Sequence, residues 1–192
     1  VDGKDVVLTI DVGIQRQLED ILKSGLDKAK SKSGSAIIMR PKTGEIVAMA
    51  NYPTYKPADF AKQTDVSVFQ NASTTSPLEV GSIMKPLTLA AALDLGVVTE
   101  TTSYYDPGQF SADGHPITNI EEDGGAGTKL MADILQLSLN TGATWLLMQM
   151  GGGQLNEKGR VAWNDYMVKH YGFGSTTGIE QGFESGGYVP DP

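Results

Sequence analysis

The 192-residue sequence contains no cysteine. This absence excludes disulfides, thiolate nucleophiles, and zinc or iron–sulfur sites built on cysteine. Only two histidines are present, His115 and His170, and they stand far apart in unlike contexts. We therefore expect both histidines on the surface rather than around a metal ion.

Long apolar runs and an excess of positive charge are also absent. No stretch approaches the roughly 18 to 20 apolar residues that cross a bilayer, and no signal peptide opens the chain. The formal net charge of −8 argues against nucleic-acid binding, which depends on basic stripes. Because the sequence starts at Val1 without methionine and stops abruptly at Pro192, we expect both ends to continue in a longer protein.

The residues that are present indicate a mixed helix-and-strand domain. Residues 6–10 are mostly β-branched and predict a short strand. Asp11 then resembles the N-cap of a helix whose apolar residues recur at helical spacing as far as Ala29. Two apolar runs, residues 36–39 and 45–50, are joined by a turn and predict a β-hairpin.

Irregular stretches and helices alternate in the rest of the chain. Residues 51–77 read as irregular, and residues 79–96 read as a helix that a glycine ends. Residues 97–127 predict a long connection, and a loop of that length inside a compact domain is more often functional than idle. Residues 128–150 have a helical pattern that "SLNTG" interrupts, and residues 172–187 form a glycine-rich ending.

The helix at residues 79–96 begins with a serine and a lysine three positions apart, Ser82 and Lys85. Residues at this spacing share one face of a helix, with Cβ atoms about 5–6 Å apart. A serine hydroxyl is a poor nucleophile without an adjacent base, and a lysine can be that base when burial keeps it neutral. Ser-x-x-Lys alone is a weak motif, so an ordinary helix start remains the alternative.

A second polar pair follows at Ser138-x-Asn140, the only Ser-x-Asn in the chain. Serine and asparagine are poor residues inside a helix because their side chains compete for backbone hydrogen bonds. Two interpretations stay open. The pair is either a cap that joins two helices or a polar wall that faces Ser82 and Lys85.

Ser-x-x-Lys followed at a distance by Ser-x-Asn resembles the penicillin-recognising serine acyltransferases. The whole chain is similar to the transpeptidase domain of a class B, monofunctional penicillin-binding protein. The stretches that carry this resemblance, in the family's order, are "DVVLTIDVGIQRQLEDIL", "RPKTGEIVAMANYPTY", "EVGSIMKPLTLAAALDLGVV", "SYYDPGQF", "LSLNTGATWL" and "YGFGSTTGIEQGFESGG".

The resemblance implies a fold and a role for each motif residue. The fold is α/β (α+β), of the penicillin-binding-protein and serine β-lactamase type, with an antiparallel sheet flanked by helices. Residues 1–192 would form a partial, truncated transpeptidase domain. Ser82 would be the acylated nucleophile, and its N–H would supply half of an oxyanion hole. Lys85 would be the general base, Ser138 would relay the proton, and Asn140 would bind the donor peptide and steady Lys85.

The chain departs from the family pattern in three places. Val80 stands where the family usually has proline, and Leu139 where a small or polar residue is common, although neither removes a catalytic atom. A Lys-Thr-Gly is present at residues 42–44, but it precedes Ser82 and has a complete explanation as the hairpin turn. The family's third motif, Lys-Thr-Gly on a strand, is expected after Pro192.

Without that strand, the family's central sheet is reduced mainly to the hairpin at residues 36–50. A lone hairpin is marginal in water, and its exposed edge can pair with another chain. We therefore predict that these 192 residues are only part of a folding unit.

The leading functional interpretation is a serine D,D-transpeptidase that cross-links peptidoglycan stem peptides and is acylated by β-lactams at Ser82. It implies no metal or organic cofactor. The resemblance implies a site outside the cytoplasmic membrane, an anchor before Val1, and partners in the cell-wall synthesis machinery. One alternative is a non-catalytic scaffold or β-lactam-sensing module. Another is a serine β-lactamase, which needs a base for deacylating water, and no motif places a glutamate for that role.

Overall fold

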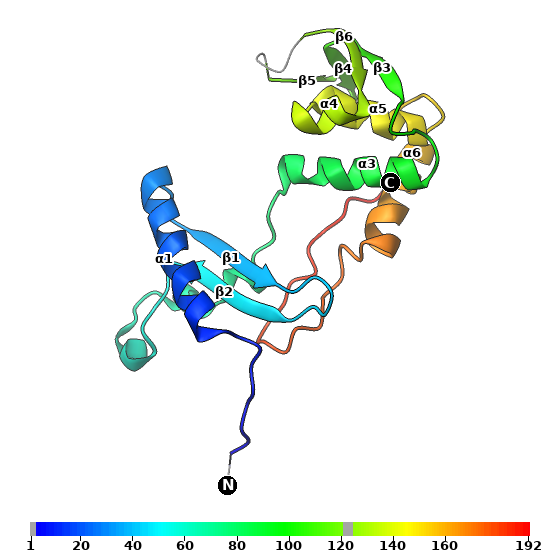
Figure 1. Cartoon of the computed structure of the whole chain (residues 1–192). Helices are drawn as coiled ribbons and strands as arrows, with labels where there is room; N and C mark the ends of the chain where they lie inside the picture. Colours follow the sequence, from blue (N-terminus) through cyan, green and yellow to red (C-terminus); the bar gives the residue numbers. More distant parts are fainter. Residues whose placement is uncertain (1–2, 121–124) are drawn as a thin grey trace. The chain divides into compact units, whose positions relative to one another are not determined.

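A computed structural model describes residues 3–120 and 125–192 as two compact units (Figure 1). The hairpin unit comprises the chain up to Pro77 together with Gly178–Ser185. The helical unit comprises Leu78–Thr177 and Gly186–Pro192. Assignment of residues 1–192 to a single partial domain stays a prediction.

A helix packed on a two-stranded sheet forms the hairpin unit. Helix α1 (Val12–Ala29) lies against strands β1 (Gly34–Met39) and β2 (Ile46–Tyr52), which pair antiparallel (Figure 1). The Asp11 side chain accepts hydrogen bonds from the N–H groups of Gly13 and Ile14, at 2.8 and 2.9 Å. The predicted N-cap, helix and hairpin are therefore confirmed.

The strand predicted at residues 6–10 is wrong. These residues have no regular secondary structure, and Val6 and Val7 are 79% and 94% exposed. Only the end of the segment is attached to the sheet, where Thr9 Oγ1 donates to Ile46 O and the Asp11 N–H donates to Val47 O at 2.9 Å. β-Branched residues favour a strand only where their backbone has a partner to pair with.

The remainder of the hairpin unit is a series of short turns of helix, in a region predicted to be irregular. They are η1 (Pro57–Lys62), η2 (Val66–Phe69) and α2 (Ala72–Thr75). The Lys-Thr-Gly of residues 42–44 lies in the hairpin turn, where the Gly44 N–H donates to Arg40 O at 2.9 Å and Gly44 has a φ of 80°. The interpretation of this tripeptide as a turn is confirmed.

Helices and short strands form the helical unit, and Figure 1 shows strands β3–β6 on one side of α4 and α5, with α3 on the other. Its elements are η3 (Gly81–Ile83), α3 (Met84–Asp94), β3 (Ser103–Asp106), β4 (Gln109–Ala112), β5 (His115–Thr118), β6 (Gly127–Leu130), α4 (Met131–Gln136), α5 (Asn140–Met150), α6 (Glu157–Asp165) and the π-helical turn η5 (Tyr166–His170). The apolar core joins α3, β3, α4, α5 and η5, and includes Leu89, Tyr104, Ile134, Leu146 and Met167.

The long connection predicted at residues 97–127 contains the strands β3, β4 and β5 and the first residue of β6. β3 pairs with β6, and β4 pairs with β5. Thr128, predicted to be helical, also lies in a strand. Each strand is four residues long. Such short segments, separated by glycine and proline, have too few alternations to be distinguished from a loop. Residues 121–124 of this connection lie outside the described residues.

Two expectations about the surface can be compared with the described residues. His115 and His170 are both exposed, as predicted. No helix within residues 3–120 and 125–192 combines the length and apolar character needed to cross a membrane.

We predict that Gly142→Ala destabilises the helical unit by about 1–3 kcal/mol, the usual cost of overpacking a core. A Cβ on Gly142 would lie 2.7 Å from Ile134 Cγ1 and 2.8 Å from the Tyr104 hydroxyl, inside van der Waals contact. Gly25→Ala is the matched control, because a Cβ at this helical glycine meets nothing within 4 Å. Chemical denaturation should show Gly142→Ala less stable than wild type and Gly25→Ala at least as stable. Equal stability of Gly142→Ala and wild type would contradict this packing.

Candidate active site

The segment that carries Ser82 is a 3-10 turn placed directly before α3. Gly81 has a φ of 62°, in the left-handed region that glycine adopts without strain. The α-helix begins at Met84 rather than at residue 79, so Ser82 precedes it and Lys85 is in its first turn. Ser82 is exposed, whereas Lys85 is only 7% exposed. The turn thus presents a hydroxyl at the surface above a buried amine.

Lys85 Nζ is the centre of the site. It lies 3.1 Å from Ser82 Oγ, 3.0 Å from Ser138 Oγ and 2.8 Å from Asn140 Oδ1. It also donates to the backbone carbonyl of Ser138. The structure therefore brings all four predicted site residues together around one nitrogen. An amine held in this way is within proton-transfer distance of both hydroxyls.

Ser138 and Asn140 occupy the break between α4 and α5. Ser138 has a φ of 52°, a left-handed conformation that is uncommon for a residue with a side chain. Hydrogen bonds from the N–H groups of Ser138 and Leu139 to the end of α4 close the turn. Leu139 is fully buried, which fixes the residues on either side of it. The Ser-x-Asn pair therefore lies at the junction of two helices and faces Lys85, but neither of its side chains caps α5, whose N-cap residue is Leu139.

A buried polar network behind Asn140 was missed by the sequence analysis. Asn140 Nδ2 donates to Thr118 O at 2.9 Å. The next residue, Thr141, has a hydroxyl that donates to Asp106 at 2.5 Å and accepts from Asn119 Nδ2 at 2.7 Å. A signal was available in "SYYDPG", where strand alternation places an aspartate on the same face as a buried tyrosine.

Tyr104 closes one side of this network. Its hydroxyl lies 3.4 Å from Asp106 Oδ2, and its ring stacks on Trp145 with centroids 4.6 Å apart. Burial, together with the adjacent Asp106 carboxylate, raises the pKa of Tyr104 well above its usual value. The phenol therefore stays neutral at physiological pH and remains a hydrogen-bond donor to the carboxylate.

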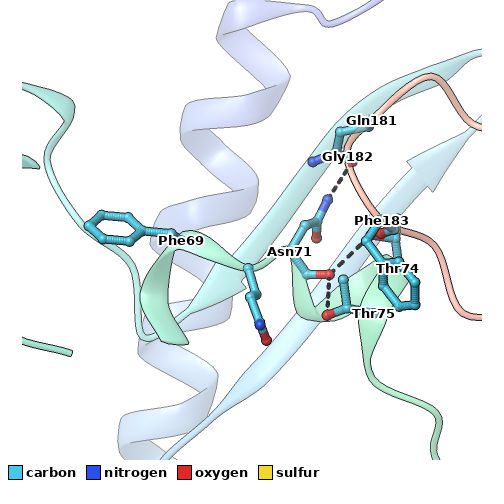
Figure 2. Close-up of a pocket in the computed structure, with 8 residues that line it drawn as sticks. Phe69, Asn71, Thr74, Thr75, Gln181, Gly182 and Phe183 are labelled. Carbon is cyan, nitrogen blue, oxygen red and sulfur yellow. Dashed lines mark hydrogen bonds between the residues drawn. The ribbon is translucent and has the colours of Figure 1, made fainter. Parts of the chain in front are cut away.

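A separate cavity of about 420 Å³ lies in the hairpin unit (Figure 2). It is lined by Phe69, Gln70, Asn71, Thr74, Thr75, Gln181, Gly182 and Phe183, and contains none of the four predicted site residues. Figure 2 shows Asn71 bonded to Gln181, with Thr74 and Thr75 donating to its carbonyl. The Asn71–Gln181 bond, together with the bond from the Ser185 N–H to Thr74 O, joins residues 178–185 to α2, so the cavity has a structural explanation.

We expect Asn71→Ala to loosen residues 178–185 and to cost about 1–3 kcal/mol, because it removes the cap of α2 and takes one hydrogen-bond acceptor from the partly buried Asn51 amide. Asn71 Oδ1 accepts from Asn51 Nδ2 at 2.6 Å, and its Nδ2 donates to Gln181 Oε1 at 2.6 Å. Hydrogen exchange at the Ser185 N–H, which bonds Thr74 O, should become faster. Asp65→Ala, which removes the cap of η2, is the control and should leave that amide unchanged. If hydrogen exchange at the Ser185 N–H is unchanged in Asn71→Ala, Asn71 does not attach residues 178–185 to α2.

Comparison with known proteins identifies the family. Residues 34–192 match the family described as "Penicillin binding protein transpeptidase domain". A probable peptidoglycan D,D-transpeptidase, PbpC of Pseudomonas aeruginosa, is 32% identical over 190 residues, which are 98% of this chain and 31% of that protein. The chain belongs to the penicillin-binding protein transpeptidase family, and its resemblance to the class B members is confirmed.

Solved structures agree with the fold. The transpeptidase domain of penicillin-binding protein 3 from Burkholderia pseudomallei, in an apo structure, has a TM-score of 0.74 and 32% identity, over 98% of this chain and 49% of that one. Penicillin-binding protein 2X from Streptococcus thermophilus has a TM-score of 0.84 and 26% identity, over 100% of this chain and 27% of that one. The predicted transpeptidase fold class is confirmed. The chain spans about a quarter to a third of the length of PbpC from Pseudomonas aeruginosa and of two further curated relatives.

Proposed function

We propose that the chain carries the acylation centre of a serine D,D-transpeptidase acting on peptidoglycan stem peptides. The observation that carries the proposal is the 3.1 Å separation between Ser82 Oγ and the buried Lys85 Nζ. A nucleophile within hydrogen-bond reach of a base, with the base itself held by further groups, is the arrangement that activates a serine. Asn140 Oδ1 and Ser138 provide those further groups.

The proposed reaction has two steps. Lys85 Nζ takes the proton of Ser82, and Oγ forms an ester with the carbonyl of the penultimate D-alanine of the donor peptide. The peptide bond to the terminal D-alanine breaks, and its nitrogen receives the proton through Ser138 Oγ, 3.0 Å from Lys85 Nζ. An amine of a second stem peptide then attacks the ester, forms the cross-linking amide and returns a proton to Ser82.

The same chemistry defines the proposed inhibitors and partners. A β-lactam presents a strained amide to Ser82 and would leave an acyl group on Oγ. By its family membership, we place the working site outside the cytoplasmic membrane, on a membrane-anchored protein of the cell-wall synthesis machinery. The proposal also includes a Lys-Thr-Gly strand elsewhere in the whole protein, which would complete the site. It further includes the pairing of another chain with the edge of β1. Ile37 and Met39 of that strand are 47% and 52% exposed.

A fluorescent penicillin tests the proposal on the complete gene product. Wild type should be labelled covalently, Ser82→Ala should not, and both should have the same melting temperature. Absence of labelling in a folded wild-type protein would overturn the transpeptidase assignment in favour of a non-catalytic scaffold. Rapid hydrolysis of a chromogenic cephalosporin would instead favour a β-lactamase.

A further inference from the structure

We propose that Asp106 is a positioning residue of this site, which acts through Thr141 and Asn119 to hold the Asn140 carboxamide against Lys85. The proposal rests on the function proposed above, because it concerns the geometry of the same acylation centre. The four residues of this relay come from three separate stretches of the chain: Asp106 ends β3, Asn119 directly follows β5, and Asn140 and Thr141 begin α5.

Asp106 has the burial and the contacts that such a role requires. Its side chain is 0% exposed, although it ends a strand close to a turn. One carboxylate oxygen, Oδ1, accepts from the Gly108 N–H at 2.7 Å. The other, Oδ2, accepts from the hydroxyl of Thr141 at 2.5 Å and from Asn119 Nδ2 at 3.4 Å. These donors are neutral, and a buried carboxylate is costly unless such donors hold it, so the carboxylate and its donors fix one another.

Thr141 and Asn119 connect Asp106 to the residues that precede them in sequence, Asn140 and Thr118. Thr141 is 0% exposed, and its N–H and hydroxyl both bond to the Asn119 side chain, at 3.1 and 2.7 Å. The neighbours of these two residues in sequence are also bonded, because Asn140 Nδ2 donates to Thr118 O at 2.9 Å. Residues 118 and 119 are therefore hydrogen-bonded to residues 140 and 141 at the start of α5.

These hydrogen bonds determine which atom of the Asn140 carboxamide faces Lys85. Asn140 is exposed, and an exposed carboxamide rotates freely unless its ends are held. With Nδ2 anchored at Thr118 O, only Oδ1 is directed at Lys85 Nζ, at 2.8 Å. If the carboxamide turned over, it would point an N–H donor at the lysine amine. Asp106 thus supports the base without touching it or the substrate.

A double-mutant cycle on the complete gene product tests this relay, with the acylation rate constant for fluorescent penicillin as the readout. Thr141→Val keeps the shape of the side chain and removes the hydroxyl that joins Asp106 to Asn119. We expect it to slow acylation about tenfold to a hundredfold, and Thr141→Ser to restore the rate to within about threefold. In an Asn140→Ala background the same Thr141→Val change should slow acylation less than about threefold, since the group it positions is gone.

Tyr166→Phe is the matched control. It also removes a hydroxyl that donates to a carboxylate, to Asp94 at 2.7 Å, in the helical unit but outside the relay. It should leave the acylation rate unchanged. If Thr141→Val does not fold, Asn119→Ala breaks the relay from the other side and takes its place in the cycle.

The possible outcomes separate the two proposals. No labelling of wild type contradicts the proposed function itself. Labelling of wild type with equal slowing by Thr141→Val in both backgrounds, or with no slowing at all, overturns the positioning role and leaves the proposed function standing.

Discussion

Lys85→Met should lower the rate of acylation by penicillin by about a hundredfold to ten-thousandfold, the range that a general base contributes. Methionine has a similar length but no amine, so the proton of Ser82 loses its acceptor at 3.1 Å. The oxygens of Ser138 and Asn140 that contact Nζ lose that contact as well. The measurement is the second-order rate constant for labelling, at a temperature well below the melting point of the variant.

Lys62→Met is the control for this experiment. Lys62 is a surface lysine whose side chain is 79% exposed and pairs with Asp59 at 2.7 Å. Its replacement should leave labelling unchanged, because exposed ion pairs contribute little. A folded Lys85→Met protein that is labelled within about tenfold of the wild-type rate would contradict the assignment of Lys85 as the base.

Ser138→Gly should separate activity from stability. The residue holds a φ of 52°, a conformation that costs an L-residue roughly 1–2 kcal/mol and glycine almost nothing. Part of this relief is offset because glycine is freer in the unfolded chain, so we expect stability to be unchanged or raised by up to about 1 kcal/mol. Acylation should nevertheless slow by about a hundredfold or more, because the relay hydroxyl 3.0 Å from Lys85 Nζ is lost.

Lys30→Gly is the matched control for the backbone effect. Lys30 has nearly the same φ, 53°, as the C-cap of α1 in the hairpin unit. Its replacement should give a similar gain in the free energy of unfolding with no change in labelling. If Ser138→Gly is labelled within about threefold of the wild-type rate, Ser138 is not the proton relay.

Local sequence patterns predicted the elements that are stabilised by interactions between residues close in sequence. Asp11 caps α1 because its carboxylate lies beside the first N–H groups of the helix, which follow it directly in sequence. The hairpin follows from two apolar runs around a turn. Ser82 and Lys85 approach each other because a spacing of three residues brings them to one side of a helical turn.

Features that depend on contacts between residues far apart in sequence could not be predicted from local sequence patterns. Residues 6–10 have strand propensity but lack the backbone partner that a strand needs. The strands β3–β6 are too short for their alternation to stand out from a loop. Asp106 and Thr141 lie 35 positions apart, and only folding makes one the partner of the other. The alternation in "SYYDPG" could have marked Asp106 as a residue on a buried face, but it could not have identified Thr141 as its partner, whereas the four central site residues were predicted from their motifs.

The central claim is that Ser82 is the nucleophile, and the position of the acyl group tests it most directly. The complete gene product is treated with a penicillin, digested, and analysed by tandem mass spectrometry. The account predicts one adduct with the full mass of the penicillin, because ring opening releases no leaving group, located on Ser82. An adduct on Ser138 or on any other residue of a folded, labelled protein would contradict it.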